Sequence, residues 1–255
     1  IAAAAASAGI GVVPSGAAPR IADTPAEVTG TERYRAMGKL TGAVAGEHYV
    51  NGTHIHVAVP DRDSGINALN KLRPWLSTLA ALAGNSPFWR GLDTDFSSWR
   101  LIHYRRWSVQ GCPPEFADAS DYDRRLARLL GSDAVLDSGH IGWAARLSEH
   151  YPTVEVRVGD AQLEAADSVL LAAVVRGLVL SNSAAPDSHP DPELLDAGLW
   201  QAARYGLGGR LMGVLGDSSA AAEQVDALVD HIRPVLDENG DLAYVLAGVQ
   251  RMLTE

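Results

Sequence analysis

The sequence predicts an α+β fold built on an antiparallel sheet. Two strand-like segments, 52–57 and 153–158, lie about a hundred residues apart, and helical patterns gather around them. Strands and helices do not alternate one by one along the chain. Because regular alternation is what marks a parallel sheet, this order favours helices that flank a few antiparallel strands.

The first half of the chain reads as helices separated by turn residues. Residues 1–9 suggest one helix, and 31–49 a second that Thr31 can cap through its hydroxyl. Apolar residues recur every three to four positions from 64 to 83, which predicts a helix that Pro74 can kink. From 89 to 116 periodicity is weak, whereas tryptophan and arginine are frequent. A long irregular segment of this kind is usually functional.

The second half is predicted to be mostly helical. Residues 121–130 suggest a short helix, and 134–143 a strand or one arm of a hairpin. A proline-containing break covers Pro186 to Pro192. The further helices are expected at 163–183, 193–205, 208–215, 219–238 and 241–254.

Composition narrows the class of protein. The chain has 255 residues, 47% of them hydrophobic and 20% charged, which is ordinary for a globular domain. Its net charge of -10 argues against a nucleic-acid binder, because binding phosphates needs a basic surface. No apolar run is long enough to span a membrane. With Cys112 as the single cysteine, no internal disulfide can form, and we expect a cytoplasmic protein.

Each strand-like segment places two polar residues on one face. Side chains alternate along a strand, so His54 and His56 point the same way, as do Glu155 and Arg157. Such groups are costly to bury unless a partner or ligand meets them. Two alternate histidines suit a metal, although a structural role is also open. The Glu155-x-Arg157 pair can likewise be a buried ion pair that serves stability alone.

Arginines suggest a phosphate or carboxylate site. Six arginines can clamp such a group through paired hydrogen bonds if they converge: Arg100, Arg105, Arg106, Arg146, Arg157 and Arg204. The alternative is a scatter of solvated surface charges. Glycine-rich stretches match neither the Walker motif nor the dinucleotide fingerprint.

Several ordered motifs carry a resemblance that covers nearly the whole chain. They are NGTHIHVAVPDRDSG, LNKLRPWLSTLAALAGNSPFWRG, SSWRLIHYRRW, GCPPEF, YPTVEVRVGDAQ and WQAARYGLGG. Together they resemble the carboxylate-amine ligase family, also called glutamate-cysteine ligase type 2. The resemblance implies a glutamine-synthetase-like catalytic domain whose curved antiparallel sheet holds ATP and Mg²⁺. It also implies that the γ-carboxyl of glutamate is joined to the amine of cysteine, and that the protein is a homodimer.

The resemblance assigns roles to individual residues. His54 matches the family's strand histidine at a metal beside ATP, and Glu155 a metal-bridging carboxylate. Arg157 matches the arginine that contacts the transferred phosphate, and His56 is a weaker match for nucleotide contact. Three further arginines match family positions in the catalytic machinery: Arg100, Arg106 and Arg146.

Two departures from the family pattern keep alternatives open. No Glu-x-Glu segment precedes His54, so we expect residues 1–255 to be the C-terminal portion of a longer catalytic domain, without its N-terminal strand or strands. The family often has Trp-Asp before its arginine, whereas this chain has Trp143-Ala144-Ala145-Arg146. The ligase can therefore use another amine, or the chain can be a non-catalytic binding homologue. Zinc-dependent hydrolysis is a more distant alternative.

Overall fold

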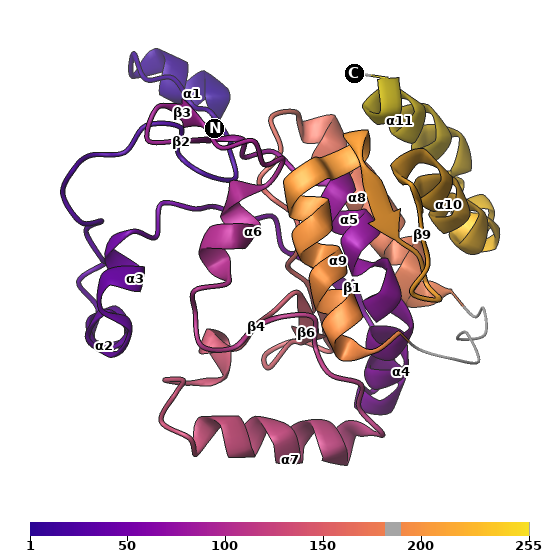
Figure 1. Ribbon diagram of the computed structural model, residues 1–255, viewed down its shortest axis with the longest axis horizontal. Helices are drawn as coiled ribbons and strands as arrows, with labels where there is room; N and C mark the ends of the chain where they lie inside the picture. The colour runs from indigo at the N-terminus through magenta and orange to yellow at the C-terminus, as the bar shows by residue number, and fades with distance from the viewer. Residues whose placement is uncertain (182–189, 255) are drawn as a thin grey trace.

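The computed structural model describes residues 1–181 and 190–254, and its mixed architecture confirms the α+β class (Figure 1). At its centre lies a three-stranded antiparallel sheet of order β1-β7-β6. Its strands are β1 (Ile55–Ala58), β6 (Ala145–Leu147) and β7 (Thr153–Val156). The two segments predicted as strands therefore pair directly, with β7 in the middle.

Helices make up most of the remaining structure. Those before β7 are α1 (Ala2–Ser7), α2 (Glu32–Thr41), α3 (Ala43–Gly46), α4 (Arg62–Leu72), α5 (Leu76–Leu82), α6 (Trp99–Tyr104) and α7 (Ala119–Leu130). Those after it are α8 (Ala165–Leu180), α9 (Pro192–Tyr205), α10 (Ala221–Glu238) and α11 (Leu242–Thr254). Single 3₁₀ turns are η1 (Arg73–Trp75), η2 (Ser138–His140) and η3 (Gly206–Gly208).

Three two-stranded pairs complete the described structure. They are β2 (Phe88–Trp89) with β3 (Leu92–Asp93), β4 (Gln110–Gly111) with β5 (Gly142–Trp143), and β8 (Arg210–Met212) with β9 (Ser218–Ala220). The β4–β5 pair is parallel and the other two are antiparallel.

Local signals explain where several predicted helices begin and break. The Thr31 side chain accepts a hydrogen bond from the Tyr34 amide, which confirms it as the cap of α2. The helix predicted over 31–49 breaks at Gly42, whose φ of 55° no helix interior adopts. Pro74 lies in η1 between α4 and α5, so the predicted kink is confirmed.

Two predicted elements are wrong. Residues 208–215 are not helical, because β8 starts at Arg210 and pairs with β9 across a turn at Gly216, whose φ is 83°. The segment 134–143 is mostly loop and η2, and only β5 at its end is a strand. The last residues of the helix predicted over 163–183, and most of the break from Pro186 to Pro192, lie outside the described residues.

The central sheet has one apolar face. Val154 and Val156 of β7 are almost fully buried, and their cross-strand partners on β6 are Leu147 and Ala145. Helices α4 and α8 pack against the sheet. Gly65 permits the close approach of α4, since a Cβ there would lie 2.7 Å from the Leu147 side chain. The opposite face is thereby left for the polar residues.

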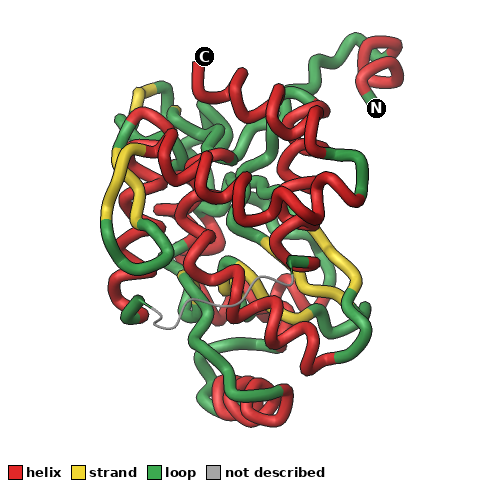
Figure 2. Tube along the Cα trace, turned by 90° about the vertical axis from the view of Figure 1, so that its right-hand side faces the viewer, coloured by secondary structure: helices red, strands yellow, loops and turns green. Residues whose placement is uncertain are grey.

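The elements divide between two sides of the molecule. Helices α8 to α11 gather on one side, whereas α1, α2 and α3 lie on the other (Figure 1). Figure 2 looks onto the helical side and shows α1 projecting from the body of the protein. None of the helices in the described part of the chain combines the length and apolar character needed to cross a membrane.

Candidate active site

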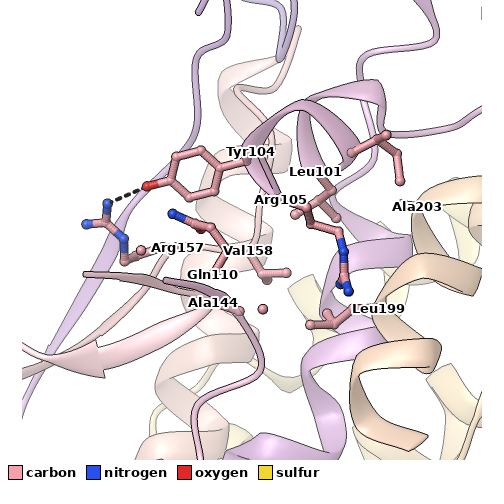
Figure 3. A pocket seen from close by; sticks show the side chains of 12 residues that line it. Leu101, Tyr104, Arg105, Gln110, Ala144, Arg157, Val158, Leu199 and Ala203 are labelled. Carbon is pink, nitrogen blue, oxygen red and sulfur yellow. Dashed lines mark hydrogen bonds between the residues drawn. The ribbon is translucent and has the colours of Figure 1, made fainter. Parts of the chain in front are cut away.

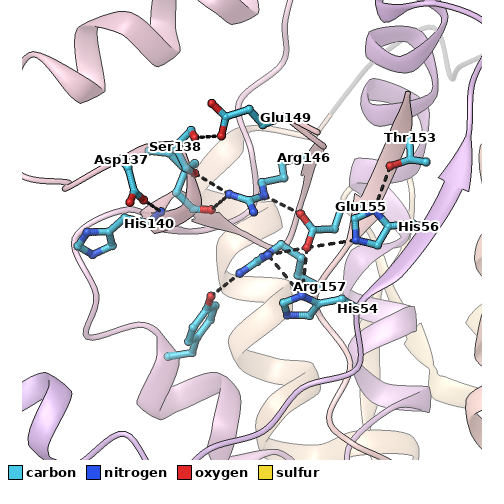
Figure 4. A network of polar contacts seen from close by, with 12 residues as sticks. His54, His56, Asp137, Ser138, His140, Arg146, Glu149, Thr153, Glu155 and Arg157 are labelled. Carbon is cyan, nitrogen blue, oxygen red and sulfur yellow. Dashed lines mark hydrogen bonds and ion pairs between the residues drawn. The ribbon is translucent and has the colours of Figure 1, made fainter. Parts of the chain in front are cut away.

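The polar face of the sheet gathers four of the predicted site residues around one carboxylate. Glu155 stands opposite His56 on β1 and opposite Arg146 on β6. His54 and Arg157 lie two residues along from these positions, so alternation brings them to the same face. Figure 4 shows all five side chains converging. We call this set, His54, His56, Arg146, Glu155 and Arg157, the polar cluster.

Both carboxylate oxygens of Glu155 are engaged. Oε1 lies 2.6 Å from an Nη of Arg157, 3.0 Å from His54 Nδ1 and 3.6 Å from His56 Nε2. Oε2 accepts a hydrogen bond of 2.7 Å from Arg146 Nε. Burial by itself raises the pKa of Glu155, but the His54 hydrogen bond and the charges of Arg157 and Arg146 hold that pKa well below its usual range. The carboxylate is therefore ionised at neutral pH.

The cluster carries more positive than negative charge. Glu155 and Arg157 are 4% and 8% exposed, and two arginines face one carboxylate. The hydrogen bond to Glu155 raises the pKa of His54, but burial and the Arg157 charge outweigh it and lower that pKa. His54 is thus neutral at pH 7, and the cluster keeps a net charge of about +1 at low dielectric. An anion is the ligand that this arrangement favours.

Backbone and hydroxyl contacts fix the two arginines in place. Arg146 donates to the carbonyls of Ser138 and Ile141 at 2.6 and 2.9 Å. Arg157 donates to the Tyr104 hydroxyl at 2.9 Å (Figure 3). The two histidines stand at the open rim, since their side chains are 38% and 37% exposed. A ligand can therefore approach the cluster from the histidine side.

Arg100 occupies a buried position behind the cluster. It is 2% exposed and donates to the carbonyls of Arg157 and Val158 at 3.0 and 3.2 Å. It also pairs with Asp160 at 3.5 Å. Arg100 therefore holds the backbone of the segment that follows β7, next to Glu155 in the sequence. Its predicted catalytic role stays a prediction.

Asp160 is a hydrogen-bonding hub that was not among the predicted site residues. Its carboxylate accepts hydrogen bonds from the Asn85 amide at 2.8 Å and from the hydroxyls of Ser86 and Ser98 at 2.6 and 2.9 Å. These bonds fix the turn after α5 and the start of α6 to the segment that follows β7. Asn85 and Ser98 lie 75 and 62 residues before Asp160, so no local pattern indicated that they pair with it.

Arg106 lies outside the polar cluster. Its guanidinium binds Glu47 at 2.5 Å and His103 Nδ1 at 2.6 Å. Burial and the Arg106 charge lower the pKa of His103 to about 4. Burial, with Arg100 and Arg106, lowers the pKa of His48 to about 4 as well. The structure does not bring Arg106 to Glu155, and its role also stays a prediction.

His54 and Glu155 can contribute ligands to a magnesium site but do not form one alone. Within the described residues, no three His, Cys, Asp or Glu side chains are arranged to hold a metal ion. Mg²⁺ usually keeps several waters and binds substrate phosphates, so it needs few protein ligands. Both oxygens of Glu155 contact an arginine, so a metal ion would bind there beside those two positive charges. His54 and Glu155 carry donor types that suit part of a coordination shell, and their metal-ligand roles stay predictions.

Comparison with known proteins decides the family. The model of glutamate-cysteine ligase family 2 matches residues 1–255. The chain belongs to this family. Family membership confirms the resemblance drawn from the sequence motifs.

Relatives in this ligase family are longer than the chain. A Nocardia farcinica protein provisionally named glutamate–cysteine ligase 2-1 is 42% identical over 233 residues, 89% of this chain and 61% of its own length. A protein of the same provisional name from Saccharopolyspora erythraea is 42% identical, covering 96% of the chain and 65% of its own length. A Mycolicibacterium vanbaalenii protein provisionally named glutamate–cysteine ligase 2-2 is 40% identical over 88% and 63%. The chain therefore spans somewhat under two thirds of these relatives.

Solved structures offer only a distant likeness for this member of the ligase family. The Pup ligase PafA in complex with ADP aligns with 80% of this chain and 44% of its own, at 17% identity and a TM-score of 0.47. At that score the likeness bears on neither fold nor function.

Proposed function

We propose that this chain forms the phosphate-binding side of the active site in an ATP- and Mg²⁺-dependent carboxylate–amine ligase. The substrates proposed first are glutamate, through its γ-carboxyl, and cysteine, through its amine. The observation that carries the proposal is the polar cluster, in which two fixed arginines face one carboxylate and leave a net positive charge. Family membership supports the same activity.

The reaction needs two displacements. In the first, a γ-carboxylate oxygen of glutamate attacks the γ-phosphorus of ATP, the bond to the bridging oxygen breaks, and ADP leaves. In the second, the amine attacks the acyl carbon, loses a proton, and inorganic phosphate leaves with the former carboxylate oxygen. A carboxylate alone is a poor acyl donor, and the acyl phosphate supplies the leaving group. Phosphoryl transfer is helped chiefly by positioned positive charge.

Each cluster residue has a defined task in this scheme. Arg157, held by Glu155 and Tyr104, offers its guanidinium to the transferred phosphoryl group. Arg146 holds Glu155 in position through its own carbonyl contacts. His54 and Glu155 would hold Mg²⁺, which when bound neutralises charge on the phosphate oxygens. His56 at the rim would contact the nucleotide.

The test of the reaction is direct. Purified protein is incubated with ATP, Mg²⁺, glutamate and cysteine, and ADP and dipeptide are measured together. We expect equal amounts of both, and transfer of ¹⁸O from the labelled γ-carboxyl of glutamate to phosphate. Absence of both products would refute the proposal. Calorimetry then tests the second candidate, a non-catalytic homologue, which would bind nucleotide without releasing ADP.

Arg157 provides a sharper test. Replacing it by alanine should lower kcat by about 10² to 10³, as loss of an oxyanion-type donor does. Arg233→Ala on α10 is the matched control, since that arginine is 44% exposed and pairs with Asp230 on its own helix. Turnover of Arg157→Ala within a few-fold of the parent would contradict the role assigned to Arg157. We further propose that the protein is cytoplasmic and forms a homodimer. Sedimentation of the purified protein tests the oligomeric state.

A further inference from the structure

We infer that a cavity beside the polar cluster binds the α-amino and α-carboxylate groups of the glutamate that the proposed reaction activates. The cavity has a volume of about 320 Å³ and lies between α7, η2 and the turn that follows β6. Two arginines and two acidic residues line it: Arg62, Arg146, Asp123 and Glu149. We call it the edge cavity, because β6 is an edge strand of the central sheet. The inference rests on the proposed function, since it assigns the place of the acyl substrate in that reaction.

Arg146 belongs to both the polar cluster and the edge cavity. Its Nε donates to Glu155, and its Nη1 donates to the carbonyls of Ser138 and Ile141. Its Nη2 has no hydrogen-bond partner among the described residues, and it is not one of their fully buried unpartnered atoms. Nη2 is therefore an accessible cationic donor on a side chain that is only 16% exposed. A carboxylate is the group that pairs best with such a donor.

The wall of the edge cavity also carries negative charge. Glu149 Oε2 accepts a hydrogen bond from the Ser138 hydroxyl, which fixes the carboxylate, and Oε1 has no hydrogen-bond partner in the described part of the chain. Asp123 is paired with Arg62. Because two arginines and two carboxylates balance one another, a ligand with both signs of charge is favoured over a simple anion. An amino acid offers its carboxylate to Arg146 and its ammonium group to Glu149.

Part of the wall is apolar. Leu126, Ile141 and Leu147 line the edge cavity, and the last two are 1% and 6% exposed. The Tyr122 ring lies next to Arg62, whose guanidinium carbon is 5.8 Å from the ring centroid. Such a surface favours methylene groups, because their contact with it removes apolar area from water. Glutamate has two methylene groups between its polar ends.

The edge cavity lies at the end of the polar cluster that faces away from His56. In Figure 4, Ser138 and Glu149 lie on one side of Arg146. Glu155 and His56 lie on its other side, in agreement with the strand order β1-β7-β6. In-line transfer at phosphorus requires the attacking carboxylate and the departing ADP to be on opposite sides of the phosphoryl group. With the nucleotide at the His56 end, the acyl substrate belongs at the Arg146 end.

The separation of the two arginines suits a short dicarboxylate. Arg146 and Arg157 contact the two oxygens of the Glu155 carboxylate, at 2.7 and 2.6 Å. An α-carboxylate bound to Arg146 therefore leaves the γ-carboxylate of the same molecule within reach of a phosphoryl group at Arg157. A triphosphate suits the edge cavity less well, because Asp123 and Glu149 repel its negative charges.

A substrate analogue tests the inference. Glutarate lacks the α-amino group of glutamate and keeps both carboxylates, and hydroxylamine as the acceptor reports activation of the carboxyl group as hydroxamate. We expect Glu149→Gln to lower kcat/KM for glutamate by about 10-fold or more, since a hydrogen bond between charged groups is lost. The loss should lie in KM, as removal of ground-state binding does. The inhibition constant of glutarate against glutamate should change by less than about two-fold, because glutarate makes no contact through an ammonium group.

The matched control is Glu238→Gln at the exposed end of α10, away from the edge cavity. It should leave all of these constants at the parent values. A parent-like KM for glutamate in Glu149→Gln would overturn the inference. A rise in KM for ATP or cysteine in place of glutamate would assign the edge cavity to that substrate and overturn the inference equally.

Binding separates this inference from the proposed function. Calorimetric titration with glutamate, with and without ADP and Mg²⁺, needs no turnover. We expect binding to the parent that is about 10-fold weaker in Glu149→Gln. Absence of binding to the parent in both conditions, or equal binding to the two proteins, overturns the inference. Failure of the parent to form hydroxamate with ATP, glutamate and hydroxylamine refutes the ligase proposal, while the titration still decides the edge cavity.

Discussion

Replacement of Glu155 by glutamine is the most informative perturbation of stability. Glu155 holds two arginines whose side chains are 16% and 8% exposed, and its own side chain is 6% exposed. Glutamine keeps the size of the side chain but removes its negative charge, so the positive charges of both guanidinium groups lose their buried counter-charge. Removing one partner of a buried ion pair costs about 3–5 kcal/mol. We expect Glu155→Gln to lower the free energy of unfolding by that amount.

Asp123→Asn is the matched control, because Asp123 pairs with Arg62 where both side chains are at least half exposed. Exposed pairs contribute about 0–1 kcal/mol, so this variant should remain close to the parent. Urea unfolding followed by circular dichroism measures both variants. If Glu155→Gln lowers the free energy of unfolding by less than about 1 kcal/mol, water must already screen the charges of the two arginines. In that case the inferred low dielectric and net positive charge of the polar cluster would be wrong.

Three further predictions follow from the surroundings of the site. His103 and His48 have a pKa of about 4 in the folded protein, below the unfolded value near 6.5, so the unfolded state binds more protons and stability falls as pH drops from about 6.5 to 4. Urea midpoints across this window should fall less steeply in His103→Asn than in the parent. An unchanged slope would count against the lowered pKa of His103. Gly52→Ala should cost about 1–3 kcal/mol, since a Cβ there would lie 2.2 Å from the buried Arg100 guanidinium; Gly30→Ala, with open space around it, is the control, and equal unfolding midpoints would contradict the prediction. Desolvation raises the pKa of the partly buried Cys112 to about 11, so a disulfide reagent should label it slowly in the native protein and rapidly in urea; equal rates would contradict the raised pKa.

The polar cluster was predictable because strand alternation is a short-range rule. His54 with His56, and Glu155 with Arg157, could be placed on shared faces from their spacing alone. That β1 pairs with β7 was not available from spacing, since sequence separation says nothing about which strands are neighbours. Arg146 joined the cluster through its register opposite Glu155, which only the structure supplies.

Other features depend on tertiary contacts that local patterns do not encode. Residues 208–215 carry apolar residues at helical spacing, yet Leu211 is fully buried in a strand that pairs with β9. Arg100 and Arg106 lie six residues apart in an arginine-rich segment, but Asp160 and Glu47, from distant parts of the chain, decide where each guanidinium rests. The cavity lined by Tyr34, Trp107 and His140 forms only where α2 and α3 approach the segment after α6, and no sequence motif predicted that contact.

Insertions in the hairpin between β6 and β7 should be tolerated less well than insertions in loops remote from β7. Residues 148–152 connect the two strands, and their number sets which side chain of β6 stands opposite Glu155. One extra residue there, absorbed by sliding β6, would send Arg146 to the hydrophobic side and bring an alanine or leucine into its place. Length variation during evolution should therefore be rare in this short connection. Loops that join elements remote from β7 carry no such restriction.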